Sequence, residues 1–132
     1  IKGVPRQLKK TSIPFFYGDL NGLRQIIKKE KIGIIKMEVA RSEKPNVHFL
    51  RNVRKLCDKN NIILIFDECT TGFRENYGGL HKTIGVNPDI AIFGKTLGNG
   101  YAINAIIGKR NLCLTLQVLL SVVLFGEKEL VM

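Results

Sequence analysis

The chain has 132 residues, of which 45% are hydrophobic, and its formal net charge is +10. This length allows one domain at most, and the hydrophobic fraction is normal for a globular protein that buries a core. No apolar run reaches the ~18 residues that a membrane-spanning helix needs. Composition therefore predicts a globular chain and excludes a transmembrane one.

The positive charge is concentrated in the first half of the chain. Residues 1–60 hold 15 Lys and Arg against 5 Asp and Glu, whereas residues 61–132 hold 6 against 6. A basic half can bind nucleic acid or an anionic membrane. No aromatic interleaving and no nucleic-acid motif accompany it, so solvated helix faces are the simpler interpretation. We expect neither a nucleic-acid nor a membrane partner, and a non-catalytic basic binding module is the alternative.

The three cysteines, Cys57, Cys69 and Cys113, show no metal or disulfide spacing. Their odd number favours a reducing, cytoplasmic setting, and we expect no metal site. The sequence begins at Ile1 with neither an initiator Met nor a hydrophobic signal region, which predicts an internal piece of a longer chain.

The first third of the chain predicts one helix and one strand. After an extended segment over 1–17, Asp19 can cap a helix. Its apolar residues recur at helical spacing and comprise Leu20, Leu23, Ile26 and Ile27. Lysines occupy its last turn, where cations suit the helix dipole. The next segment, 32–39, predicts a strand that contains the acid Glu38 near its end.

The remainder predicts alternating helices and strands. Asn46 can cap a second helix over 47–59, and a strand over 62–66 follows at once. A helical turn over 81–84, a strand over 89–93, a glycine-rich turn over 94–100 and a strand over 101–107 complete the order. This alternation predicts an α/β fold with a mostly parallel sheet and flanking helices.

Two of the apolar strands lead to residues that carry chemistry. The run 62–66 is followed by Asp67 and Glu68, and the run 90–93 is followed, after one glycine, by Lys95. Short, continuous, β-branched runs are typical of strands buried on both faces of a parallel sheet. In open α/β sheets the ligand lies outside the carboxyl ends of the strands. We therefore expect Asp67 and Lys95 to face one crevice.

An acid and a lysine in one crevice suit pyridoxal phosphate (PLP). A lysine held among apolar groups has a lowered pKa, so its amine becomes nucleophilic and can bind an aldehyde. A carboxylate that faces a pyridine nitrogen keeps that nitrogen protonated, and the protonated ring is the electron sink of PLP chemistry. Taken alone, Lys95 is more simply interpreted as a surface lysine and Asp67 as a strand-end cap.

A phosphate-loop ATPase is the rival enzyme interpretation. The strand that leads to Asp67 and Glu68 has the form of a Walker B strand, and residues 94–96 look like the end of a Walker A loop. That loop requires a glycine five residues before Gly94, where this chain has Asp89. Walker A also normally precedes Walker B. The PLP interpretation is therefore preferred to the ATPase.

Three motifs carry a family resemblance. They are DECTTGFR at 67–74, GVNPDI at 85–90 and GKTLGNG at 94–100. Their order, spacing and flanking strands resemble the class III PLP-dependent aminotransferases, in particular the glutamate-1-semialdehyde 2,1-aminomutase-like branch. The likeness extends from about Ile13 to Asn111. It implies that residues 1–111 are part of the large PLP-binding domain of a fold-type I transferase.

The resemblance also implies roles for four residues. Lys95 would bind PLP covalently and shuttle a proton between the substrate and the cofactor. Asp67 would pair with the pyridinium nitrogen. Cys69 would pack against the ring face, where the family more often has Val. Thr70 would lie near the ring hydroxyl, where relatives have Gln or Met.

Other positions depart from the family pattern. Glu38 corresponds to the acid of a Glu-Pro strand end, but Val39 replaces the proline. Asn99 replaces a glycine of the last motif. His48 and His81 match nothing catalytic in the family, so both are interpreted as ordinary polar residues.

By resemblance, the parent enzyme would transfer an amino group between an amino acid or amino compound and a keto or aldehyde carbon. It would act as an aminotransferase or, within one molecule, as an aminomutase. Its partners would be a small-molecule amino donor and acceptor and a second copy of itself, since the family's active sites form at a homodimer interface. The family's phosphate anchors and small domain are missing here, so we expect weak or no PLP binding and no turnover by these 132 residues alone.

The last segment, 112–132, resembles nothing in the family, although the family's phosphate-binding threonine is expected near residues 115–125. One hypothesis is a reading-frame slip. With suitable codons, a shift of one base turns this segment into a sequence that resembles the family's Ser-Ser-Thr-Phe-Trp-x-Glu-Arg. The alternative is an amphipathic C-terminal helix, and the coding DNA decides between the two.

Overall fold

The computed structural model describes residues 5–8, 10–40, 42–112 and 114. The chain forms two compact units, residues 1–32 and residues 33–132. The segment 112–132, for which a reading-frame slip is the hypothesis, lies almost wholly outside the described residues. No helix in the described part of the chain is long and apolar enough to cross a membrane.

The first unit contains a short 3-10 helix, η1 (Arg6–Leu8), and the helix α1 (Leu20–Lys29). α1 begins where predicted because the Asp19 carboxylate accepts a hydrogen bond from the Gly22 N–H at 2.9 Å. A Cβ atom at Gly22 would overlap that carboxylate, so glycine in the first turn leaves room for the cap. The predicted helix is confirmed, and it buries Leu23.

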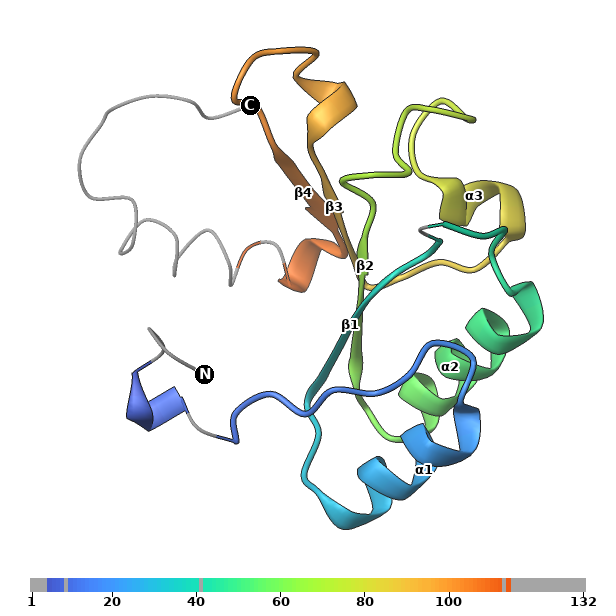
Figure 1. Ribbon diagram of the computed structural model, residues 1–132, viewed down its shortest axis with the longest axis vertical. Coiled ribbons are helices and arrows are strands. Elements are labelled where there is room, and N and C mark those ends of the chain that lie inside the picture. Colours follow the sequence, from blue (N-terminus) through green and yellow to red (C-terminus); the bar gives the residue numbers. More distant parts are fainter. Residues whose placement is uncertain (1–4, 9, 41, 113, 115–132) are drawn as a thin grey trace. The chain divides into compact units, whose positions relative to one another are not determined.

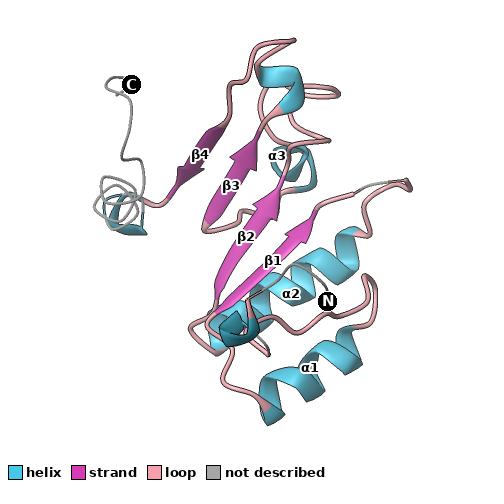
Figure 2. Cartoon of the chain, turned by 60° about the vertical axis from the view of Figure 1, so that its left-hand side comes forward, coloured by secondary structure: helices cyan, strands magenta, loops and turns pink. Residues whose placement is uncertain are grey.

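The second unit is built on a four-stranded sheet (Figures 1 and 2). Its strands are β1 (Ile34–Glu38), β2 (Ile63–Asp67), β3 (Ile90–Phe93) and β4 (Ala105–Gly108), in that order across the sheet. The first three strands are parallel, and β4 runs antiparallel to β3. The predicted α/β fold with a mostly parallel sheet is confirmed.

The helices α2 (Val47–Lys59) and α3 (Leu80–Ile84) lie on the same side of this sheet (Figures 1 and 2). α2 begins at the predicted residue because the Asn46 side chain accepts a hydrogen bond from the Phe49 N–H at 3.0 Å. α3 ends at Gly85, whose φ of +66° is a left-handed conformation that glycine adopts without steric cost.

The core of the second unit lies between α2 and the sheet. Leu64 and Phe66 of β2 are fully buried, as are Leu50 and Val53 of α2. Each such side chain stabilises the fold by about 1.5–3 kcal/mol relative to an exposed one. Ile65, which lies between Leu64 and Phe66, is only half-buried, because successive side chains of a strand point to opposite faces.

Burial of β2 on both faces, which the sequence predicts, is therefore not found within this unit. Right-handed crossovers between neighbouring parallel strands place their helices on one face, and α2 and α3 share a face here. The isoleucines of the opposite face, Ile63, Ile65 and Ile92, stay half-buried. β3 comes closer to the prediction, since three of its four residues are buried.

β4 begins at Ala105 rather than at Tyr101 as predicted. The backbone of Asn99 and Gly100 has φ angles of +43° and +103°. The Tyr101 N–H then donates to the Gly98 carbonyl at 2.9 Å, which closes a turn. The chain is still turning where the strand was predicted to start, so pairing with β3 begins later.

Candidate active site

The carboxyl ends of β2 and β3 lie side by side. Asp67 is the last residue of β2 and is in register with Ile92 of β3, and Lys95 follows β3 after Gly94. The Lys95 ammonium group donates a hydrogen bond to Thr70 Oγ1 at 2.8 Å. The structure therefore brings the lysine against the loop that follows Asp67.

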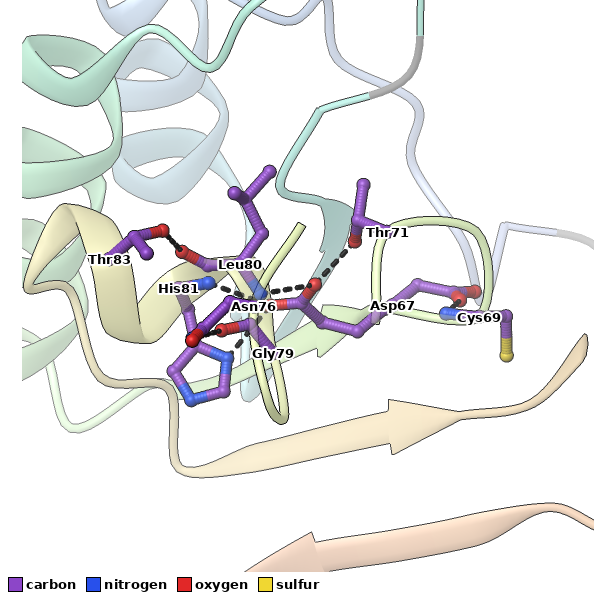
Figure 3. Close-up of polar contacts among 9 residues, drawn as sticks. Asp67, Cys69, Thr71, Asn76, Gly79, Leu80, His81 and Thr83 are labelled. Carbon is purple, nitrogen blue, oxygen red and sulfur yellow. Dashed lines mark hydrogen bonds and ion pairs between the residues drawn. The ribbon is translucent and has the colours of Figure 1, made fainter. Parts of the chain in front are cut away.

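Asp67 is held by two donors and is 25% exposed. Its Oδ1 accepts the Cys69 N–H at 3.2 Å (Figure 3), and its Oδ2 lies 2.9 Å from the Lys36 ammonium group. Burial alone would raise the pKa of this carboxyl, but the hydrogen bonds from Lys36 and Cys69 outweigh it and hold the pKa below its ordinary value. Asp67 is therefore ionised at neutral pH.

Two further residues of this region come from β1. Glu38 is the last residue of the strand, is half-buried and is in register with Asp67. Lys36 lies two residues earlier, so both side chains share the sheet face of Asp67. The ion pair between Lys36 and Asp67 crosses from one strand to the next, and the sequence did not predict it because it depends on the strand register.

Cys69 lies against the start of the lysine turn. A Cβ atom at Gly94 would lie 3.2 Å from Cys69 Sγ and 2.5 Å from Asn104 Oδ1, so only glycine allows these groups so close. Burial, together with the neighbouring Asp67, raises the pKa of the Cys69 thiol. A raised pKa favours the protonated thiol at neutral pH.

Lys95 adopts a backbone conformation that is rare outside glycine. Its φ is +46°, and such a left-handed residue costs about 1–3 kcal/mol. The side chain is exposed. The described residues at this end of the sheet thus leave Lys95 open to water, as the simpler interpretation of it as a surface lysine expects.

Glu68 follows Asp67 directly but occupies the opposite face of the strand and is fully buried. Its carboxylate accepts the N–H groups of Leu80 at 3.0 Å and His81 at 2.9 Å. His81 Nδ1 lies 2.7 Å away, and the Thr71 hydroxyl donates a further hydrogen bond (Figure 3). Burial would raise the pKa of Glu68, but the hydrogen bonds, that from His81 first, hold it below its ordinary value.

The network around Glu68 is structural, since it ties the start of α3 to the end of β2. Sequence reasoning gave Glu68 no role and interpreted His81 as an ordinary polar residue, whereas His81 is buried beside this carboxylate. The period of two in a strand could have shown that Asp67 and Glu68 cannot share a face. The contact with His81 joins residues 13 positions apart and has no local signal. His48 is exposed, as an ordinary polar residue would be.

Asp89 is a second buried carboxylate that sequence reasoning did not single out as a functional group. It accepts the Leu64 N–H at 2.8 Å and pairs with Arg54 at 2.9 Å and with Lys109 at 2.5 Å. These partners belong to β2, to α2 and to the residue that follows β4. Asp89 precedes β3, so this cluster, which we call the Asp89 staple, lies at the opposite end of that strand from Lys95.

The second unit also contains a cavity of about 430 Å³ beside β3 and β4. The aromatic residues Phe73, Tyr77 and Phe93 contribute to its lining. None of the four predicted site residues lines it. The candidate site is therefore the open strand end around Asp67 and Lys95 rather than this cavity.

Comparison with known proteins gives the family. Residues 20–121 match the model of the family "Aminotransferase class-III". The chain is 38% identical to 3-aminobutyryl-CoA aminotransferase of Cloacimonas acidaminovorans, over 96% of this chain and 33% of that protein. It is 36% identical to glutamate-1-semialdehyde 2,1-aminomutase of Syntrophobacter fumaroxidans, over 83% of this chain and 27% of that enzyme.

Solved structures show the same fold. The PLP internal aldimine form of the FumI protein of Sphingopyxis sp. MTA144 matches with a TM-score of 0.73 and 26% identity, over 80% of this chain and 27% of that one. An omega-transaminase of Sphaerobacter thermophilus matches with a TM-score of 0.72 and 26% identity, over 86% of this chain and 27% of that one. The chain thus spans about a third or less of these relatives. By sequence and by fold, it belongs to the class-III aminotransferase family.

Proposed function

We propose that this chain supplies the PLP-binding lysine and the ring-nitrogen carboxylate of an enzyme that transfers an amino group. The proposal rests on one observation, the bond from Lys95, which follows β3, to Thr70 in the loop that follows Asp67 at the end of the neighbouring strand β2. The amino group moves between an amino acid or other amino compound and a keto or aldehyde carbon.

The residues present fit the groups that PLP offers. An exposed lysine amine suits the aldehyde, and an ionised carboxylate with a lowered pKa suits a protonated ring nitrogen. The hydroxyl of Thr70 suits the ring hydroxyl, and the protonated thiol of Cys69 suits a ring face. When bound, PLP supplies an electron sink that stabilises a carbanion at the substrate carbon.

The chain's own residues then have distinct tasks. Asp67 keeps a negative charge at the ring nitrogen, because its lowered pKa leaves it ionised at neutral pH. Lys95 binds the cofactor and moves a proton to and from the substrate carbon at its Nζ atom. Thr70 orients that Nζ atom through the bond at 2.8 Å. Glu68 acts at a distance, since its bonds to Thr71 and His81 fix the loop that carries Thr70.

The amino donor and acceptor are small molecules, and they are recognised mostly by parts of the enzyme that this chain does not span. The relatives differ in the substrates that their names give, a 3-aminobutyryl-CoA for one and glutamate 1-semialdehyde for the other. We expect the parent enzyme to work as a homodimer in the cytoplasm, with neither nucleic acid nor membrane as a partner. The exposure of Lys95 supports weak PLP binding and no turnover by this chain alone.

The test is covalent labelling of the purified chain. PLP in large excess, followed by borohydride reduction and peptide mapping, should fix the cofactor on Lys95 above the other lysines. Lys95→Ala should lose this label, whereas Lys55→Ala, which removes an exposed lysine of α2, should keep it. Equal labelling of Lys95 and of the other exposed lysines would contradict the proposal.

A further inference from the structure

The ion pair between Lys36 and Asp67 occupies the carboxylate that the cofactor needs. Lys36 lies on β1, with its Nζ 2.9 Å from Asp67 Oδ2, while Oδ1 accepts the Cys69 N–H at 3.2 Å. Each oxygen of the carboxylate therefore already faces a positive or positively polarised donor. A protonated ring nitrogen must share Oδ2 with the lysine or displace it.

The surrounding charges make Lys36 the immediate competitor. Among the described residues, the titratable groups near Asp67 include Lys36 and Glu38 from β1, the Cys69 thiol from its own loop and Lys95 from the turn after β3. Lys36 is in direct contact with the carboxylate, whereas Lys95 bonds to Thr70. A lysine ammonium group and a pyridinium are both cations, so each disfavours the other at one carboxylate.

We propose that Lys36 competes with the cofactor ring for Asp67. Without a cofactor, Lys36 neutralises the carboxylate and holds it in place. With the cofactor bound, Lys36 weakens the hold of Asp67 on a protonated ring nitrogen and so disfavours protonation of the ring. The competition with a bound cofactor rests on the proposed function, whereas the ion pair between Lys36 and Asp67 does not.

The effect is limited by solvent. The Lys36 side chain is 56% exposed and that of Asp67 is 25% exposed, so the pair is screened by water and salt. We expect a change of about two- to fivefold in PLP affinity, the range of a partly exposed ion pair. The effect should shrink as salt is added.

The decisive variant is Lys36→Met, which keeps most of the length of the side chain and removes its charge. It should bind PLP two- to fivefold more tightly than wild type, as measured by the PLP concentration that half-saturates the label on Lys95. Lys36→Arg keeps the ion pair and should match wild type. Lys55→Met removes the same charge from α2, and it controls for the general attraction between a basic protein and the phosphate.

A second readout needs no cofactor. The pKa of the Asp67 carboxyl, followed by NMR in PLP-free protein, should rise in Lys36→Met and stay unchanged in Lys55→Met. Equal or weaker PLP binding by Lys36→Met relative to Lys55→Met would overturn the competition. An unchanged Asp67 pKa would overturn the ion pair. Absence of label on Lys95 in every variant would instead overturn the claim that this chain positions the cofactor by itself, and the competition with it, while the NMR titration would still decide on the ion pair.

Discussion

The two ends of β3 hold their charges in different ways. At the amino end, the Asp89 side chain is 7% exposed, and its carboxylate has three partners: the Leu64 N–H, Arg54, which is 17% exposed, and Lys109, which is 62% exposed. At the carboxyl end, Asp67 is 25% exposed and its charged partner, Lys36, is more than half exposed. Both acids belong to the motifs that identify the family. Asp89 holds several elements of the fold together, whereas for Asp67 we propose that a ligand replaces its partner Lys36.

The difference should appear most strongly when each acid is removed in turn. Asp89→Ala leaves the Leu64 N–H without its acceptor and Arg54, which is 17% exposed, without its buried partner. We expect a loss of about 3 kcal/mol in the free energy of unfolding, as for other broken buried pairs. Urea unfolding followed by circular dichroism measures it.

Asp58 provides a matched control, because it pairs with the same arginine, Arg54. The Asp58 side chain is 62% exposed, so Asp58→Ala should cost less than about 1 kcal/mol. Equal losses in the free energy of unfolding for Asp89→Ala and Asp58→Ala would show that burial does not determine how much these ion pairs stabilise the fold.

Removing the charge of Glu68 should have the next largest effect. Glu68→Gln keeps the size of the side chain but replaces an acceptor oxygen by an NH2 group, which faces donors from Leu80 and His81. Leaving one buried donor unsatisfied costs about 1–3 kcal/mol. Hydrogen exchange at the start of α3 should accelerate together with this loss of stability. Unchanged exchange there would contradict the role of Glu68 as the tie between β2 and α3.

Lowering the pH should reduce the difference in the free energy of unfolding between wild type and Glu68→Gln. The pKa of Glu68 is lowered in the folded state from an ordinary value of 4.5. Its contribution to stability is therefore fully present above pH 4.5 and is lost as the pH falls through the lower, folded value. Urea unfolding from pH 7 down to pH 3 measures this difference in the free energy of unfolding. A difference that grows towards pH 3 would contradict a lowered pKa of Glu68 in the folded state.

The smallest effect on stability is expected at the carboxyl end of β3. Asp67→Asn keeps an acceptor for the Cys69 N–H and loses only a partly exposed ion pair, so the free energy of unfolding should change by less than about 1 kcal/mol. The measurement is the same urea titration. A loss as large as that of Asp89→Ala would mean that Asp67 serves the fold rather than a ligand.

Local signals predicted much of this fold. The caps Asp19 and Asn46 were predicted, because a capping side chain acts within three residues of its own position. The strands β2 and β3 were found within one residue, since their apolar runs are bounded by polar residues. Asp67 and Lys95 were predicted as neighbours from the rule that parallel strands end at one edge.

What was missed depends on partners that are distant in the sequence. The pair between Lys36 and Asp67 requires the register of β1 on β2, and the bond between Glu68 and His81 requires the path of a whole loop. The burial of β2 was overestimated because periodicity does not show which segment covers each face of a sheet. The start of β4 was misplaced because the turn at Gly100 continues into residues that look apolar.

The most direct test compares PLP fixation on Lys95 in wild type and in Asp67→Asn, two proteins that we expect to be nearly equal in stability. Borohydride reduction at a series of PLP concentrations, with quantitative peptide mapping, gives the affinity for this one lysine. We predict an affinity about tenfold lower in Asp67→Asn, which corresponds to the loss of one charge-assisted hydrogen bond to the ring. Equal labelling of Lys95 in both proteins would contradict the claim that Asp67 and Lys95 hold one cofactor between them.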